Sequence, residues 1–195
     1  MTVAPPGTPL WYPQKDDFAP RLGLAWQPAP SLVVRAGAGI FYDLGYAEVA
    51  NVASSFPYVQ GKTILGTSFP LSAANAAPVP FTTSPPVSYL AVVDPNHVLP
   101  RTYEWNFAVE RSSGKADALT ITYLGAAGRK LMRTDHYYEP NPNFTGEFDL
   151  MRNDADSSYE ALQVQFRHRY SHGLETLLSI PGRMRSTMLL PTSAI

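Results

Sequence analysis

Apolar and polar residues alternate along several segments of the sequence, and a period of two indicates β-strands rather than helices. In the clearest segment, 31–43, every second residue from Leu32 to Tyr42 is apolar, and the residues between them include Arg35 and two glycines. This segment is longer than the ~5–6 residues of a typical soluble strand. It reaches the ~9–11 residues that a tilted strand needs to cross a bilayer. The sequence therefore predicts strands of membrane-spanning length.

The connections between alternating segments differ strongly in length. Further strands are predicted at 21–26, 102–110, 119–123, 159–169 and 174–178. Short turns are predicted at 27–30, 111–115 and 170–173, and long irregular stretches at 44–101 and 132–158. Outer-membrane barrels combine short periplasmic turns with long extracellular loops. We therefore predict an all-β fold: an antiparallel up-and-down meander of about six strands in three hairpins, forming a partial transmembrane β-barrel.

Each predicted strand has one apolar and one polar face, which we expect to meet lipid and a polar lumen respectively. The residues expected to face lipid are Leu22, Leu24, Trp26, Val34, Ile40, Tyr42, Tyr103, Trp105, Phe107, Val109, Ile121, Tyr123, Leu162, Val164 and Phe166. The residues expected to face the lumen are Arg35, Glu104, Asn106, Thr122, Gln163, Gln165 and Arg167. Trp26, Tyr42 and Tyr103 lie near strand ends, where aromatic girdles are found.

The composition excludes several other classes. The net charge is -1, so we expect no nucleic-acid partner. The chain has no cysteine, which rules out disulfides, thiolate metal sites and a cysteine nucleophile. Only 16% of the residues are charged, against roughly 25% in soluble domains. Residues Met1 to Leu10 lack the basic and apolar regions of a signal peptide, so we expect an exported protein that is incomplete at its start.

Several polar groups in the sequence lack the pattern of a functional site. Gly37-Ala38-Gly39 lacks the third glycine and the following helix of a nucleotide-binding loop. The acidic pairs and histidines considered are Asp16-Asp17, Asp154 with Asp156, His97, His136, His168 and His172. The acids are predicted to be solvated loop residues, and the histidines lack metalloprotease spacing. We predict no enzyme activity, no cofactor and no metal site.

The alternation alone leaves a second fold open, because a soluble antiparallel sheet with one wet face has the same pattern. The alternative function is therefore a soluble extracellular β-domain that binds carbohydrate or protein. A secreted hydrolase has no supporting constellation of acid and base in the sequence.

Several motifs, in order, resemble one family of barrels. They are Asp17–Trp26, Val34–Asp43, Thr102–Asn106 through Val109–Arg111, Ile121–Gly125 with Gly128–Leu131, Tyr159–Val164, and Arg169–Leu174. In this order they are similar to Oar-like TonB-dependent receptors, large outer-membrane barrels abundant in Acidobacteria. The resemblance covers roughly residues 10–179 and supplies fewer strands than the family's barrel.

The resemblance implies a fragment of a TonB-dependent transporter in the outer membrane of a Gram-negative bacterium. The intact parent would take up a bulky nutrient or act at the cell surface. Its partners would be outer-membrane lipid, a plug domain and TonB, and neither the plug nor a TonB box has a counterpart in this chain. The stretch 44–101 would be the principal ligand contact, and the isolated fragment is expected to be inactive.

The last residues depart from the family pattern. After Ser179 the family usually continues Tyr-Thr-Trp-Ser, whereas this chain reads Ile180-Pro181-Gly182. One inserted base, within a permitted choice of codons, converts the tail into Tyr-Thr-Trp-Ser-His-Ala-Leu-Asp-Asp. We therefore expect residues 1–179 to be the barrel segment and 180–195 to be a frameshifted, non-native tail.

Overall fold

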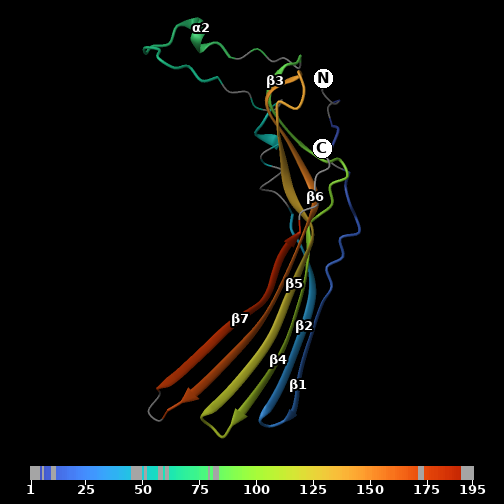
Figure 1. The fold of residues 1–195 in the computed structure, drawn as a ribbon, viewed down its shortest axis with the longest axis vertical. Coiled ribbons are helices and arrows are strands. Elements are labelled where there is room, and N and C mark those ends of the chain that lie inside the picture. Colours follow the sequence, from blue (N-terminus) through green and yellow to red (C-terminus); the bar gives the residue numbers. More distant parts are fainter. Residues whose placement is uncertain are drawn as a thin grey trace. The chain divides into compact units, whose positions relative to one another are not determined.

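The structure is a computed structural model. It describes residues 5, 7–9, 12–44, 50, 52–56, 59, 62–78, 80, 84–170 and 174–189, with the side chains of 183–186 outside the description. The elements with defined bounds are β1 (Arg21–Ala29), β2 (Leu32–Tyr42), α2 (Ala73–Ala76), β3 (Val87–Val93), β4 (Arg101–Ser113), β5 (Asp117–Tyr138), β6 (Phe144–Arg169) and β7 (Glu175–Leu189) (Figure 1). The predicted all-β fold is confirmed. Within the described residues, no helix is long and apolar enough to span a membrane.

The chain divides into two compact parts. The first, here called the β3 part, comprises Met1–Pro13, Gly45–His97 and Met132–Arg152. The second, here called the sheet part, comprises Gln14–Leu44, Val98–Leu131 and Asn153–Ile195. The long strands β5 and β6, of 22 and 26 residues, contribute to both.

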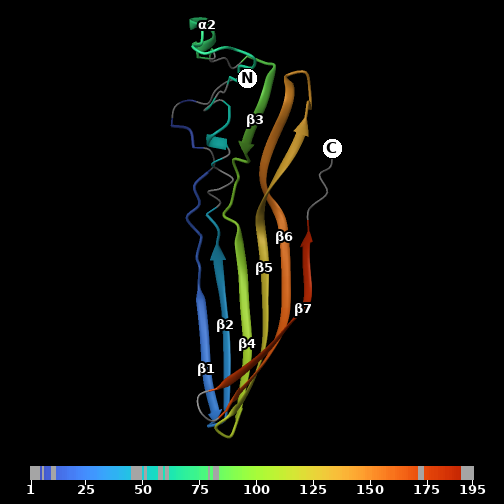
Figure 2. The ribbon, with the colours of Figure 1, turned by 90° about the vertical axis from the view of Figure 1, so that its left-hand side faces the viewer.

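Three hairpins build the sheet part, as the sequence predicts. The hairpins are β1–β2, β4–β5 and β6–β7, and each pairs antiparallel. β2 also pairs antiparallel with β4 and so joins the first hairpin to the second. Gly114 begins the β4–β5 turn with a φ of 61°, a backbone conformation that glycine adopts without steric cost. The β1–β2 and β4–β5 turns lie at the same end of the sheet as the end of β6 and the start of β7 (Figures 1 and 2).

The strand register keeps apolar residues together on one face. Leu24 pairs with Ala36, Ala36 with Phe107, and Phe107 with Tyr123. Directly paired residues of an antiparallel ladder share a face, so these four form one row across the sheet. Because side chains alternate along each strand, the whole period-two apolar set of β1, β2, β4 and β5 shares that face. A shift of one residue in any pair would move a strand's apolar set to the other face.

The sheet is open. Among the described residues, β1 pairs only with β2, and β7 pairs only with β6. Each therefore has one edge of backbone N–H and C=O groups without a strand beside it in the part of the chain that the structure describes. Such edges are points at which another strand can add.

The β3 part corrects the prediction of two irregular stretches. Within 44–101 lie α2 and β3, and β3 pairs parallel with the first half of β6, Val92 lying opposite Leu150. The predicted loop at 132–158 is wrong as well, because β5 continues to Tyr138 and β6 begins at Phe144. The Glu139 amide donates to the Gly146 carbonyl at 2.9 Å and closes this hairpin. The described chain thus contains seven strands rather than about six.

A small hydrophobic core stabilises the β3 part. It consists of Val52, Ala91, Val93 and Met151, with Tyr89 and Met132 packed against it. Met151 is 2% exposed. None of the residues expected to face lipid belongs to this cluster or to the other buried hydrophobic residues of the described chain.

Candidate functional site

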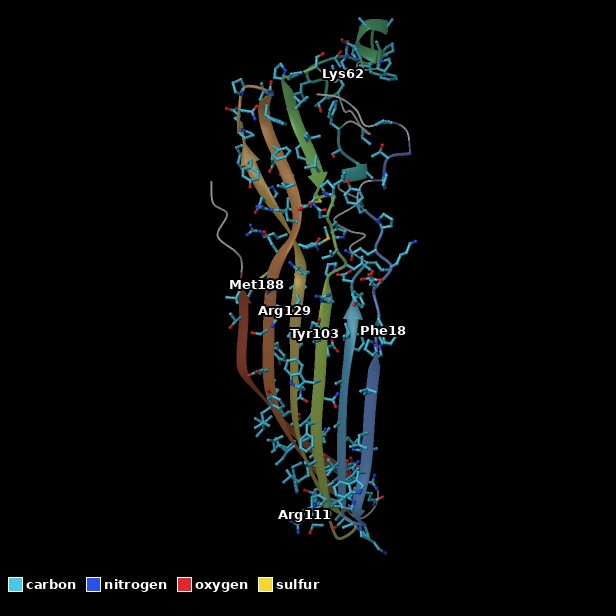
Figure 3. All side chains as sticks on the ribbon, turned by 90° about the vertical axis from the view of Figure 1, so that its right-hand side faces the viewer. Phe18, Lys62, Tyr103, Arg111, Arg129 and Met188 are labelled. Carbon is cyan, nitrogen blue, oxygen red and sulfur yellow. The ribbon has the colours of Figure 1, made fainter. Side chains whose placement is uncertain are left out.

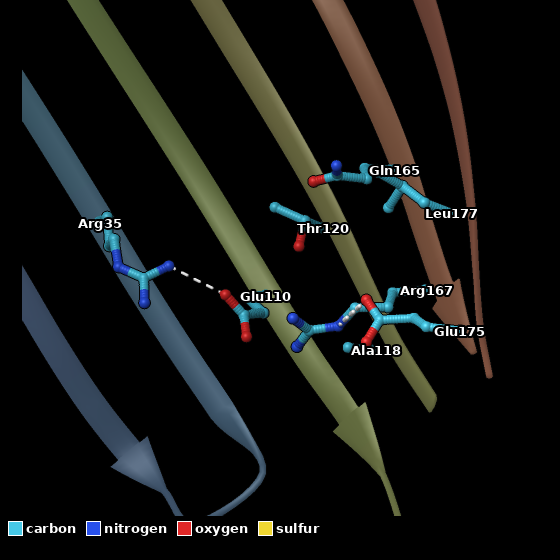
Figure 4. Close-up of a pocket in the computed structure, with 8 residues that line it drawn as sticks. All are labelled: Arg35, Glu110, Ala118, Thr120, Gln165, Arg167, Glu175 and Leu177. Atoms are coloured by element: carbon cyan, nitrogen blue, oxygen red, sulfur yellow. Dashed lines mark hydrogen bonds and ion pairs between the residues drawn. The ribbon is translucent and has the colours of Figure 1, made fainter. Parts of the chain in front are cut away.

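A polar cavity of about 430 Å³ lies on the sheet part, on the face opposite the apolar rows. Its lining residues come from five strands: Arg35, Glu110, Ala118, Thr120, Gln165, Arg167, Glu175 and Leu177 (Figure 4). Neighbouring strands lie about 4.8 Å apart, so five strands laid flat would span roughly 19 Å. One cavity can be lined from β2 to β7 only if the sheet curls toward this side. The polar face of the sheet is therefore concave and the apolar face convex.

Charged side chains of both signs line the cavity. Arg35 Nη1 lies 2.9 Å from Glu110 Oε2, joining β2 to β4. Glu175 lies between two arginines: Oε1 is 4.0 Å from Arg167 Nε, and Oε2 is 3.1 Å from Arg169 Nε. The side chains of Arg35 and Glu110 remain 53% and 29% exposed. Since such pairs keep much of their hydration, they create a wet, charge-balanced surface and add little to stability.

The convex face is apolar and exposed. Leu22 is 78% exposed, Leu24 61% and Phe107 49%. A soluble domain would bury such a row, because contiguous apolar surface in water is costly and marks sites that meet another protein or a membrane. The four-strand row of Leu24, Ala36, Phe107 and Tyr123 is part of this apolar surface.

The polar residues singled out from the sequence lie on the concave face. Arg35, Gln165 and Arg167 line the cavity itself. The others lie on the same face, because residues an even number of positions apart on a strand point to the same side. Glu104 and Asn106 lie on the same side of β4 as Glu110. Thr122 lies on the same side of β5 as Thr120, and Gln163 on the same side of β6 as Gln165. The remaining lining residues, Glu110, Ala118, Thr120, Glu175 and Leu177, were not singled out, although alternation from their neighbours on the strands could have found them.

The apolar residues singled out from the sequence share the convex face. Those of β1, β2, β4 and β5 are placed by the printed register, and those of β6, Leu162, Val164 and Phe166, alternate with the cavity residues of that strand. Aromatic side chains lie near both ends of the sheet part: Trp26 is near the β1–β2 turn, and Tyr42 and Tyr103 are near the other end. Tyr103 lies near the start of β4, and Arg111 lies at its other end, toward the turn (Figure 3). Tyr42 ends β2, and its hydroxyl donates to the Phe18 carbonyl at 3.4 Å.

One close contact on this face explains a glycine. Gly125 pairs with Trp105, and a Cβ added to Gly125 would lie 2.4 Å from Trp105 Cε2. The indole therefore lies over the bare glycine backbone. An aromatic ring packed over a glycine of the neighbouring strand covers the backbone that glycine leaves exposed, and it helps to fix the strand register.

The structure also places the glycines and acidic pairs for which the sequence predicts no functional site, and it corrects one of these predictions. Gly37 and Gly39 lie within β2, where an added Cβ at Gly37 would meet the Asn106 side chain at 3.0 Å. Asp154 and Asp156 were predicted to be loop acids; this is wrong, because both lie on β6. Asp156 Oδ1 accepts a hydrogen bond from the Lys130 amide at 3.3 Å. Asp16 and Asp17 lie before β1, where Asp16 is exposed and Asp17 is half-buried.

His168 and His136 make close contacts with carboxylates. His168 Nδ1 lies 2.5 Å from Asp117 Oδ1. His136 Nδ1 lies 2.8 Å from both Glu147 Oε1 and Asp149 Oδ1. His97 is buried in the β3 part, and His172 lies outside the described residues.

The sequence reasoning missed the group formed by His136, Glu147 and Asp149. The signal was Glu147 and Asp149 two residues apart, but the stretch that holds all three was predicted to be irregular. The hydrogen bond to Asp149 raises the pKa of His136 above its ordinary value, desolvation lowers it, and the contact with Glu147 raises it further. Burial raises the pKa of Tyr89, and the hydrogen bond from its hydroxyl to Asp149 adds to this effect.

Comparisons with known proteins agree with this architecture. Residues 2–179 match the family described as "Outer membrane beta barrel domain". The outer membrane transporter YddB from Escherichia coli has a similar structure, with a TM-score of 0.54 at 10% sequence identity. That similarity covers 87% of this chain and 20% of the transporter. At this identity the similarity concerns the fold. No curated protein matches the sequence.

Proposed function

The chain belongs to the outer membrane β-barrel domain family, and on this premise we propose that it forms a section of the wall of a TonB-dependent transporter. Its place is the outer membrane. The single observation that carries the proposal is the opposite character of the two faces: the sheet is polar where it is concave and apolar where it is convex. A barrel wall in a membrane needs this combination, with a wet interior and an apolar exterior.

The strands suit this role energetically. In hydrocarbon every backbone N–H and C=O must be paired, because an unsatisfied group costs several kcal/mol. The ladders from β1 to β7 satisfy the groups between neighbouring strands, whereas the outer edges of β1 and β7 need further strands. The proposal therefore assigns those edges to other strands of the complete barrel.

The two faces then have separate tasks. The apolar rows of β1, β2, β4, β5 and β6 contact outer-membrane lipid. The polar set around Arg35, Glu110 and Gln165 lines the interior and contacts the plug domain of the intact parent, which TonB would energise. The stretch 44–101 would contact the ligand, a bulky nutrient.

Site-directed spin labelling tests the assignment of the faces. This chain has no native cysteine to remove. Phe107→Cys and Asn106→Cys place labels on adjacent residues of β4 that point to opposite faces. In the complete gene product, reconstituted in lipid, we expect the label at 107 to be relaxed by oxygen and shielded from a water-soluble nickel chelate. The label at 106 should show the reverse.

The alternative, a soluble extracellular β-domain that binds carbohydrate or protein, gives a different result. Both labels would then be accessible to the nickel chelate, or the label at 107 would be shielded from oxygen and chelate alike in a dry protein core. Either result would remove the transporter proposal.

We further propose that the native barrel sequence ends near Ser179 and that 180–195 results from a frameshift. The family match ends at residue 179. Pro181 lies opposite Gln163 in the β6–β7 ladder, where proline cannot donate a hydrogen bond. Resequencing the locus should restore a frame that continues Tyr-Thr-Trp-Ser after Ser179. A locus without such a frame would contradict this proposal.

A further inference from the structure

Three side chains with metal-binding atoms converge in the β3 part. His136 comes from β5, and Glu147 and Asp149 come from one face of β6. Their nearest ligand atoms all lie within 4.8 Å of one another. We propose that His136, Glu147 and Asp149 bind a divalent transition-metal ion, with Zn²⁺ as the ion that the ligand set suits best. The inference does not depend on the transporter proposal.

The positions of the two carboxylate oxygens around His136 suit a bound cation. Nδ1 lies 2.8 Å from Glu147 Oε1 and 2.8 Å from Asp149 Oδ1. An imidazole nitrogen carries at most one proton, so it can donate one well-aligned hydrogen bond to one of the two oxygens. The arrangement also brings two carboxylates together, and like charges at this range repel. A divalent cation among the three atoms would satisfy both carboxylates and the nitrogen lone pair.

The geometry requires only a small adjustment. Tetrahedral Zn²⁺ binds nitrogen and oxygen at about 2.0–2.2 Å, which separates neighbouring ligand atoms by roughly 3.3 Å. The two N–O distances of 2.8 Å must therefore open by about 0.5 Å. The side chains of His136 and Glu147 are 52% and 31% exposed and have room to move. The Asp149 side chain is 9% exposed and supplies the fixed ligand.

The surroundings of Asp149 resemble the support of a metal ligand. The Tyr89 hydroxyl donates to Asp149 Oδ2 at 3.0 Å, which leaves Oδ1 directed at His136. Tyr89 lies on β3, opposite Glu147 in the parallel ladder. Ligating carboxylates are commonly oriented by such hydrogen bonds. The ligands and their support thus come from three neighbouring strands, so the bound ion would fasten β3, β5 and β6 together.

The ligand set selects the type of ion. Imidazole favours zinc, copper, nickel and iron, whereas Ca²⁺ and Mg²⁺ prefer six or more oxygen ligands or retain several waters. Three protein ligands also leave one tetrahedral position open for water or for a donor atom of another molecule.

Calorimetry with ZnCl₂ tests the site in the complete gene product, purified from outer membranes in detergent. We expect saturable binding with one strong site that is lost or weakened at least about 100-fold in His136→Ala and Asp149→Asn. Removal of an orienting hydrogen bond typically costs 10–100-fold, so Tyr89→Phe should weaken binding about 10-fold. The matched control is His168→Ala, because His168 contacts one carboxylate, Asp117, and should leave the Zn²⁺ affinity unchanged.

A spectroscopic measurement distinguishes the loss of a metal ligand from the misfolding of a variant. Co²⁺ in the same site should give visible d–d absorption in the unmodified protein, and added Zn²⁺ should displace it. Glu147→Gln, a change at a partly exposed side chain, should alter this spectrum while the far-ultraviolet circular dichroism stays unchanged. The proposal is overturned if Zn²⁺ binds without saturation, if His136→Ala and Asp149→Asn bind as tightly as the unmodified protein, or if Ca²⁺ binds and Zn²⁺ does not.

Discussion

A lysine placed on either face of β4 should have very different energetic consequences. β4 has 13 residues, Arg101–Ser113, and Phe107 is its middle residue. At about 3.3 Å per residue the strand is roughly 43 Å long, which a tilt of about 45° reduces to roughly 30 Å, the thickness of the hydrocarbon layer. In the proposed barrel wall, Phe107 and its row partners Ala36 and Tyr123 would therefore lie near the bilayer midplane.

Phe107→Lys should destabilise the barrel by about 2–4 kcal/mol, the cost of a lysine at the midplane on the lipid face of a barrel. This corresponds to a roughly 30- to 700-fold change in the equilibrium constant for unfolding. Asn106→Lys adds the same charge one residue away, on the concave face beside Glu104, where water and an opposite charge are available. Its cost should remain within about 0.5 kcal/mol, as for ordinary surface substitutions.

The free energy of unfolding is measured by urea titration of the complete gene product in lipid vesicles, followed by tryptophan fluorescence. Heat-modifiable mobility in gel electrophoresis checks that each variant has formed the barrel. If Asn106→Lys costs as much as Phe107→Lys, the assignment of lipid and water to the two faces is refuted. Equal costs near zero would refute it as well, because no hydrocarbon would then contact Phe107.

Three further predictions concern packing, charge and the strand edges. Gly125→Ala should cost about 1–3 kcal/mol, because the new methyl group collides with the Trp105 indole, and Trp105→Ala in the same chain should recover part of that loss in urea titrations. Arg35→Ala should change the free energy of unfolding by less than about 1 kcal/mol, because its ion pair with Glu110 is well hydrated; a larger loss by the same assay would show that the pair is dry. The 195-residue chain expressed alone should aggregate through the open edges of β1 and β7; a soluble monomer with a cooperative melting transition in analytical ultracentrifugation and calorimetry would contradict this.

Local pattern alone predicted the faces and the hairpins. A strand repeats every two residues, so the side on which Leu24 or Arg35 lies follows from its position in the strand. The turn at Gly114 could be read in the same way, because a short polar segment with glycine between two alternating runs favours a hairpin. The ladders from β1 to β5 then bring the apolar residues of neighbouring strands together, for example Leu24, Ala36, Phe107 and Tyr123.

The extended ends of β5 and β6 could not be predicted in this way. The residues from Met132 to Ser158 are rich in charge, asparagine and proline and lack apolar alternation, so their sequence is typical of a loop. Their strand structure comes from pairing with each other and with β3, which is a nonlocal contact. β-structure depends on such neighbours more than on the intrinsic preference of the residues.

The sequence by itself determined which residues of each long strand share a face, with the apolar residues on one side and the polar residues on the other. The tertiary structure decided what those faces enclose. Curvature of the sheet brings Arg35 of β2 and Glu175 of β7 to one cavity, although 140 positions or so separate them along the chain and no local pattern relates them. The pairing of β5, β6 and β3 likewise brings His136 to Glu147 and Asp149. Alternation is a property of one strand, whereas a cavity or a ligand set is a property of several strands held in one register.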